Sequence, residues 1–258
     1  MLRGVFDGDA ELYDRVRPRY PAGLVDELVR QAQLGSGSRV LEVAPGTGQL
    51  TVPLARTGSA LTAVELGPAL AAVARRNLAN WPLAHVEVDE FEAWPLPAEP
   101  YDLVVCATAF HWLDPAVRVP KMRQALRPGG TLAIVTTEHV AGGSAEFWVE
   151  VQGCYERWDP DATEPGLRLT PESELRTDTG ELERTDGLGP VVVRRFARDI
   201  TYTADQYIDV LRTYSGHRAL DDHTREGLLG CVRELIDGTY GGSISKRYLH
   251  ELITASAR

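Results

Sequence analysis

The chain has 258 residues, 43% apolar and 25% charged, which is the composition of an ordinary globular protein. This length suits one large α/β domain or two small ones. The formal net charge of −10 argues against nucleic-acid binding, because an acidic surface repels phosphate backbones. Nucleic-acid-binding proteins normally carry a basic stripe, and the arginine pairs at 75–76 and 194–195 are too short to form one.

Strand-like and helical segments alternate through the first half of the chain. Short apolar runs predict strands at 39–44, 60–65, 84–88, 101–107 and 131–137. Helices are predicted at 49–57, from Pro68 to about 80, and at 114–126. Asp114 is expected to cap the last of these helices, with Pro115 at its first position and a turn at 127–130 after its end. Strands that alternate with helices predict a doubly wound α/β fold with a parallel sheet.

After residue 138 this rhythm changes. Helices are expected at 144–158, 204–214 and 218–237, strands at 191–202 and 243–256, and a long irregular connection at 159–190. Because such sheets often end in an antiparallel edge, the last strands are expected to be antiparallel.

The cysteines and the apolar segments indicate where in the cell the protein is found and whether it binds a metal. Cys106, Cys154 and Cys231 are far apart, odd in number and contain no Cys-x-x-Cys pair, so neither a disulfide framework nor a zinc knuckle is suggested. No His, Asp and Glu cluster has metal-ligand spacing, and no metal is predicted. No run reaches the roughly 18 apolar residues that span a bilayer, and the N-terminus does not read as a signal peptide. A cytoplasmic protein without membrane contact is expected.

The stretch LEVAPGTGQL, residues 41–50, follows the first predicted strand. Gly46 and Gly48 let backbone N–H groups approach a ligand beyond the carboxyl end of the sheet. Glu65 ends the second predicted strand, 21 residues after Ala44, and an acid placed there can accept both ribose hydroxyls of a nucleoside. The pattern predicts a nucleoside-containing ligand.

Two other nucleotide sites fit less well. A nicotinamide dinucleotide site needs a third glycine where Thr51 stands, and a mononucleotide P-loop needs a Gly-Lys-Ser/Thr sequence that does not follow. Glu42, two residues before the loop, also differs from the dinucleotide pattern and is suited to an ammonium group or to a structural role in the turn.

LEVAPGTGQL resembles the first motif, acid-x-Gly-x-Gly-x-Gly, of the class I S-adenosylmethionine-dependent methyltransferases. Other segments agree in order and spacing. Glu65 matches the ribose-binding acid, and Asp89 matches the acid near the adenine, with Phe91 beside that ring. YDLVVCATAFHWLD at 101–114 matches the fourth strand and its exit loop, and LRPGGTLAIV at 126–135 matches the turn into the fifth strand.

Three further segments resemble a small-molecule subgroup of that family, so the resemblance covers nearly the whole chain. FDGDAELYDRVRPRYP at 6–21 is similar to an N-terminal segment in which a tyrosine helps to close over the cofactor. The His111-Trp112 pair recurs in the subgroup, some members of which esterify carboxylic acids. YTADQYIDVLRTYS at 202–215 resembles its helical cap.

The resemblance implies a doubly wound, mostly parallel, seven-stranded Rossmann-like sheet with a helical cap. It implies a single domain, 1–258, with a lid segment at 1–25 and acceptor-pocket insertions at 138–190 and 203–242. The implied cofactor is S-adenosyl-L-methionine and the implied partner is a small-molecule acceptor, with O-methylation, possibly of a carboxylate, favoured.

The site residues that the resemblance and the loop imply fall into three groups. The predicted cofactor-binding residues are Tyr13, Tyr20, Glu42, Ala44, Gly46, Thr47, Gly48, Gln49, Glu65, Leu66, Asp89, Glu90, Phe91 and Thr108. The predicted acceptor-binding residues are Trp112, Tyr214 and His217. His111 is the candidate general base, which a phenol or alcohol acceptor needs and a carboxylate does not.

Ala44 stands where the family has its first glycine. If this position has a positive φ, alanine costs about 1 kcal/mol there. If φ is negative, the methyl group only narrows the space beside the methionine part of the cofactor. Two rival functions accompany this departure: a member that binds the cofactor without methylating, such as a natural-product cyclase, and a partner-binding module on an inactive methyltransferase fold.

Overall fold

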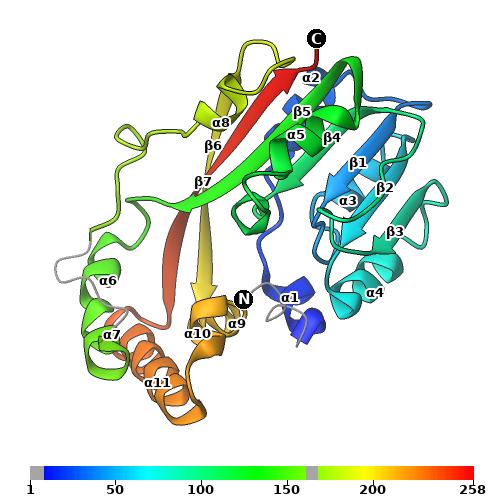
Figure 1. Cartoon of the computed structure of the whole chain (residues 1–258). Coiled ribbons are helices and arrows are strands. Elements are labelled where there is room, and N and C mark those ends of the chain that lie inside the picture. The colour runs from blue at the N-terminus through cyan, green and yellow to red at the C-terminus, as the bar shows by residue number, and fades with distance from the viewer. Residues whose placement is uncertain (1–8, 161–167) are drawn as a thin grey trace.

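A computed structural model describes residues 9–160 and 168–258, and a seven-stranded sheet is its framework (Figure 1). The strands are β1 (Arg39–Val43), β2 (Ala60–Glu65), β3 (Ala84–Val88), β4 (Tyr101–Ala107), β5 (Leu126–His139), β6 (Val192–Thr203) and β7 (Ser243–Ser256). Their order across the sheet is β3-β2-β1-β4-β5-β7-β6. Neighbouring strands run parallel except that β7 is antiparallel to both β5 and β6. The predicted doubly wound, mostly parallel sheet is confirmed, including its antiparallel edge.

The helices are α1 (Ala10–Val16), α2 (Ala22–Gln31), α3 (Thr51–Ala55), α4 (Pro68–Asn77), α5 (Arg118–Gln124), α6 (Ala145–Glu150), α7 (Gln152–Trp158), α8 (Gly180–Glu183), α9 (Ala204–Arg212), α10 (Ser215–Ala219) and α11 (Asp222–Thr239). The predicted helices are present with shifted boundaries, the one expected at 144–158 is divided into α6 and α7, and α1, α2, α8 and α10 were not predicted. The helix predicted to begin at Asp114 begins at Arg118, because the Asp114 carboxylate accepts the N–H of Ala116 in a preceding turn. The predicted turn at 127–130 is incorporated into the start of β5.

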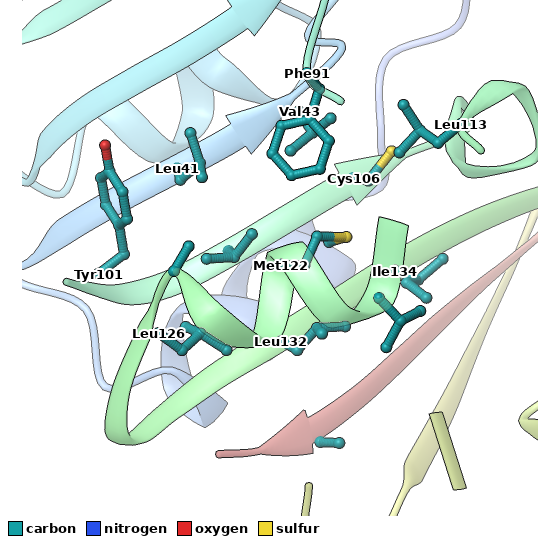
Figure 2. Packing of buried hydrophobic residues seen from close by; sticks show 14 of the residues in the cluster. Leu41, Val43, Phe91, Tyr101, Cys106, Leu113, Met122, Leu126, Leu132 and Ile134 are labelled. Carbon is teal, nitrogen blue, oxygen red and sulfur yellow. The ribbon is translucent and has the colours of Figure 1, made fainter. Parts of the chain in front are cut away.

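Side chains on the central strands alternate between two hydrophobic layers, one on each face of the sheet. Leu103 and Val105 of β4 pack with α2, α3 and α4, whereas Val104 and Cys106 face the side that α5 covers. Figure 2 shows this second layer, with Met122 of α5 lying over the sheet. This alternation explains why β4 is apolar at successive positions, as a strand buried on both faces must be.

The segments after β5 form a separate hydrophobic cluster beyond one end of β6 and β7. Helices α6, α7, α9 and α11 supply most of its side chains (Figure 1). A disulfide between Cys154 of α7 and Cys231 of α11 links two of these helices. The sequence suggested no disulfide because the two cysteines are 77 residues apart, and that expectation is wrong.

The expected division into lid, central sheet and cap insertions stays a prediction. Residues 1–8 of the predicted lid and 161–167 of the first predicted insertion lie outside the described residues. Within the described part, α1 contacts both α4 on the sheet side and α9 in the cap. The N-terminal segment therefore bridges the two parts of the molecule.

Candidate active site

A cavity of about 480 Å³ opens beyond the carboxyl ends of the parallel strands. Side chains from the exits of β1, β2, β3 and β4 line one end, and α10 with parts of β5 and β7 lines the other. This is where open α/β sheets bind ligands, and the volume is typical of a small-molecule site. Of the predicted cofactor-binding residues, eleven line it: Tyr13, Tyr20, Ala44, Gly46, Gln49, Glu65, Leu66, Asp89, Glu90, Phe91 and Thr108.

The glycine loop and the acid after β2 are joined directly. The Glu65 carboxylate accepts the N–H of Gly46 at 2.9 Å with one oxygen and the N–H of Gly67 at 2.9 Å with the other. The Glu65 side chain is buried yet lines the cavity. The role of Glu65 in accepting ribose hydroxyls stays a prediction.

Two cavity residues other than glycine adopt the left-handed backbone conformation. Ala44 has φ of 53° and Thr108 has φ of 58°. Their N–H groups are nevertheless paired, with the carbonyls of Val64 and Val135 respectively. For Ala44 this decides between the two alternatives left open above: the position is one that favours glycine, and alanine occupies it at a conformational cost. Backbone strain of this kind gathers at functional sites.

Three of the predicted cofactor-binding residues lie behind the cavity wall: Glu42, Thr47 and Gly48. The Thr47 hydroxyl donates to the Asp14 carboxylate at 2.8 Å and accepts from Gln49, so it braces the loop against α1. Gly48 has φ of 96° and shapes the turn. These residues support the loop from behind the cavity wall, and their contact with the cofactor stays a prediction.

Glu42 is 1% exposed and lies beneath the loop. Burial, and to a smaller extent the charge of Glu65, raises the pKa of Glu42 to about 8. Glu42 is therefore mainly protonated at neutral pH, and a neutral carboxylic acid is a poor partner for the ammonium group that the sequence suggested.

The residues after β2 and β3 form the acidic end of the cavity. Leu66, Asp89 and Glu90 are exposed at its edge, while Phe91 is buried and presents its ring. The Asp89 carboxylate accepts the N–H of Glu90 at 2.7 Å, which orders this turn.

The N-terminal segment carries a residue that the sequence analysis missed, Arg17. Its guanidinium lies 4.9 Å from the ring centre of Tyr13 and 4.7 Å from that of Tyr214, and it donates to the carbonyl of Thr213. The Tyr13 ring lies against Gly46. Arg17 therefore connects the glycine loop, through Tyr13, to the cap.

A chain of hydroxyl groups runs from the N-terminal segment to β7. Tyr20 hydrogen-bonds to Thr108 at 2.9 Å, Thr108 to Thr137 at 3.2 Å, and Thr137 to Nδ1 of His250 at 2.9 Å. Burial, and then the charge of Arg198, lowers the pKa of His250 to about 4, so its imidazole is neutral at pH 7. The chain ties the predicted closing tyrosine to a histidine that the sequence analysis did not select.

Antiparallel pairing explains why His250 was missed. The antiparallel register of β5 and β7 pairs His250 with Thr137 and Tyr248 with His139. The first half of β7 therefore lies beside the carboxyl end of β5. Lys246, Tyr248 and His250 alternate along β7 and all line the cavity. The i, i+2, i+4 spacing places these polar and aromatic residues on one face of a strand, and this could be seen in the sequence. Only the register of β7 against β5 shows that this face lines the cavity.

The candidate base and two of the three predicted acceptor-binding residues line the cavity. His111 and Trp112 line the cavity, and their ring centres are 4.8 Å apart. The His111 side chain reaches solvent at the rim, but partial burial, and then the charge of Arg118, lowers its pKa, so the neutral base predominates at pH 7. Tyr214 lines the cap end.

His217 does not line the cavity, so its contact with an acceptor stays a prediction. It is half-buried behind Tyr214, and its Nε2 hydrogen-bonds to Tyr155 at 3.0 Å. Helix α10 therefore packs this side chain against α7 of the cap.

No helix within residues 9–160 and 168–258 is long and apolar enough to cross a bilayer. In the same ranges no group of three or more His, Cys, Asp or Glu side chains is arranged to hold a metal ion.

Comparison with known proteins gives the family. The family model described as methyltransferase domain matches residues 41–134. An uncharacterised methyltransferase of Mycobacterium tuberculosis is 33% identical over 180 residues, 69% of this chain and 69% of that protein. An uncharacterised methyltransferase-like protein of Schizosaccharomyces pombe is 30% identical over 131 residues, 50% of each chain. A solved structure of an S-adenosylmethionine-dependent methyltransferase from Thiobacillus denitrificans, in complex with S-adenosyl-L-homocysteine, has a similar fold, with a TM-score of 0.54, 16% identity and 96% of both chains covered.

Proposed function

Because the chain belongs to the class I S-adenosylmethionine-dependent methyltransferases, we propose that it methylates an oxygen atom of a small-molecule acceptor, with a carboxylic acid favoured. The observation that carries the proposal is the cavity itself, which joins the glycine loop and Glu65 to a cap end that contains cations and neutral histidines. Its volume of about 480 Å³ suits a cofactor and a small acceptor better than a polymer.

The residues at the loop end have the chemistry that S-adenosylmethionine needs. Glu65 would accept the ribose hydroxyls, and the backbone of Ala44 to Gly46 would approach the methionine part. Arg17 has a buried Nε without a hydrogen-bond partner and would hold the carboxylate of that part. Phe91, with Asp89 and Leu66, would hold the adenine.

When bound, the cofactor supplies a methyl group on a sulfonium, which is already a good leaving group. The residues of the chain then have to align the acceptor and exclude water, which is catalysis by proximity. A carboxylate needs no base. For a phenol or alcohol, neutral His111 at the rim would take the proton, and His139 and His250 are neutral imidazoles deeper in the same cavity.

Calorimetric titration with S-adenosylmethionine and S-adenosylhomocysteine tests the cofactor half of the proposal. We expect micromolar binding of both, and failure to bind either, also after Ala44→Gly, would reject the site. Transfer of a labelled methyl group to a panel of carboxylic acids, phenols, alcohols and amines tests the acceptor half. We expect turnover with oxygen acceptors, and transfer to amines alone would reject O-methylation.

Two other classes of function give different results in the same assays. A member that uses bound cofactor only as a scaffold would bind it without transferring the methyl group to any acceptor. A partner-binding module on an inactive fold would not bind it. The arrangement of Glu65 with the glycine loop favours binding, because its carboxylate already organises the loop amides.

The cytoplasmic location expected from the sequence belongs to this proposal. Disulfides are rare in a reducing cytosol, so the Cys154–Cys231 bridge gives a direct test. Thiol labelling in freshly lysed cells should find both cysteines reduced. A fully oxidised pair would argue for an oxidising compartment.

A further inference from the structure

Lys246 is a buried cation at the cap end of the cavity. It is 5% exposed and lines the cavity from β7, on the same face of the strand as Tyr248 and His250. It is one of only two lysines in the chain, and the other, Lys121, donates to two backbone carbonyls. The sequence analysis and the family comparison assign Lys246 no role.

The ammonium of Lys246 is enclosed by aromatic rings. Its Nζ lies 5.1 to 6.0 Å from four ring centres, those of Trp148, Tyr207, Tyr214 and Tyr248. Ring faces attract a cation, but they do not accept its N–H groups as an oxygen does. One N–H reaches the Tyr214 hydroxyl at 3.1 Å. An ammonium has three donors, so two lack a protein oxygen in the part of the chain that the structure describes.

No carboxylate balances this charge. Among the described residues, no Asp or Glu lies within ion-pair distance of Lys246. Its neighbour in the strand, Arg247, forms an ion pair with Asp199. A buried charge without a counter-charge is costly, which makes this position favourable for an anionic ligand.

The neighbouring titratable groups leave the positive charge of Lys246 uncompensated. Burial first, and the charge of Lys246 second, lowers the pKa of His139 to about 3 and that of His217 to about 4, so both rings are neutral. Arg17 adds a second positive charge across the Tyr214 ring. The acids that line the cavity come from the exits of β2 and β3, on the other side of β1 and β4 in the sheet order: Glu65, Asp89, Glu90 and Glu92.

We propose that Lys246 and the Tyr214 hydroxyl form an anion subsite that anchors an acidic group of the methyl acceptor. This proposal rests on the proposed function and names its substrate class: acids that carry a second nucleophilic oxygen, such as dicarboxylic or hydroxycarboxylic acids. The anchored group is not the one methylated. Methylation removes the charge of a carboxylate, so an ammonium bound to that carboxylate would stabilise the ground state more than the transition state.

The same charges select against other acceptors. A cationic amine would enter a cavity end that already holds Lys246 and Arg17, and like charges repel strongly in a poorly solvated site. A phosphate offers the same oxygen chemistry as a carboxylate, so binding measurements have to separate the two.

The test is calorimetric titration of the protein saturated with S-adenosylhomocysteine. The probes are succinate against succinamide, benzoate against benzamide, and inorganic phosphate. We expect at least one carboxylate to bind about tenfold or more tightly than its amide, and Lys246→Met to remove that preference while the affinity for S-adenosylhomocysteine stays within about twofold. Lys246→Arg should keep the preference, and Tyr214→Phe should weaken it severalfold.

Arg247→Met is the matched control, because it removes an equal charge from the opposite face of β7. It should leave the carboxylate preference intact. Equal binding of every acid and amide, or a preference that survives Lys246→Met, would overturn the subsite. Tighter binding of phosphate that also depends on Lys246 would keep the subsite and assign it to phosphorylated acceptors.

Failure of the subsite is distinguishable from failure of the proposed function. Labelled methyl transfer to an acidic acceptor that is unchanged by Lys246→Met would reject the subsite and leave the methyltransferase activity standing. Lys246-dependent carboxylate binding without any methyl transfer would do the reverse.

Discussion

The two ends of the cavity are built by different means. The loop end uses backbone amides and acids that follow β1, β2 and β3, and its parts lie within fifty residues of one another. The cap end uses side chains of β5, β7 and α10, which are up to about a hundred residues apart and include Lys246 and two neutral histidines. Local backbone geometry suits a ligand shared by a family, whereas side chains from distant segments can change with the acceptor.

The largest predicted effect is a loss of stability caused by a change in the cap, which should leave cofactor binding at the loop end unchanged. In purified protein with the Cys154–Cys231 bridge oxidised, Cys154→Ser removes the link between α7 and α11 and should lower the free energy of unfolding by about 2–5 kcal/mol, because the bridge closes a long loop. Chemical denaturation measures this loss. The affinity for S-adenosylhomocysteine should stay within about twofold.

The double variant Cys154→Ser with Cys231→Ser is the control, and so is the reduced wild type. Both should match the single variant. A comparable loss of cofactor affinity in all three would show that the cap and the loop end are not separable.

Glu65→Gln tests the loop end. The substitution keeps the shape of the side chain but removes the charge that orders the amides of Gly46 and Gly67. Hydrogen bonds to charged groups contribute about 1.5–3 kcal/mol, so the cofactor should bind roughly tenfold to a hundredfold more weakly in calorimetry.

The matched control is Glu90→Gln, which removes an equal charge from an exposed position on the same cavity wall. It should cost much less. If Glu65→Gln instead left cofactor affinity unchanged while Glu90→Gln reduced it, the assignment of the ribose end would be wrong.

The buried Glu42 beneath the loop should make the free energy of unfolding depend on pH. The folded chain keeps the Glu42 proton up to about pH 8, whereas the unfolded chain releases it near the ordinary value of 4.5. Between these values the folded state binds more protons, so this group makes the free energy of unfolding fall as pH rises, by at most about 1.4 kcal/mol per pH unit. Above pH 8 both states are ionised and the slope from this group ends.

Glu42→Gln removes the titration and keeps the shape of the side chain. Denaturation of both proteins from pH 5 to 9 should give a stability difference that grows in favour of the variant as pH rises to about 8. A difference that is constant with pH would mean that Glu42 is already ionised in the folded protein.

The smallest expected effect is that of Ala44→Gly. Glycine relieves the cost of a φ of 53°, about 1–2 kcal/mol, but gives the unfolded chain more freedom, worth about 0.4–1 kcal/mol. The variant should therefore be equally stable or more stable by up to about 1 kcal/mol in thermal unfolding, with cofactor affinity changed only severalfold. A large loss of stability would mean that the alanine methyl contributes packing that outweighs the strain.

The sequence predicted the loop end of the cavity well and the cap end poorly. The strand and helix rhythm, the glycines of the loop and Glu65 were readable because each depends on neighbours within one strand–loop–helix unit. The acid Glu42 was also noticed, but its protonated state results from burial beneath the loop and from the charge of Glu65 on the next strand, which pattern alone does not fix.

The cap side shows the limit most clearly. His217 was selected because of its place in the chain, yet packing turns it toward Tyr155. Lys246 and His250 were passed over, yet the register of β7 against β5 brings them into the cavity. The Cys154–Cys231 bridge was passed over for the same reason, since contact between α7 and α11 cannot be inferred from two cysteines 77 residues apart.

The sequence by itself determined the sheet architecture, the glycine loop and the acid that orders it, because hydrophobic period and turn chemistry act over a few residues. Tertiary structure alone decided the charge of the cap end, the disulfide and which histidines reach the cavity. These depend on strand register and helix packing, in which a shift of one residue would turn Lys246 to the other face of the sheet.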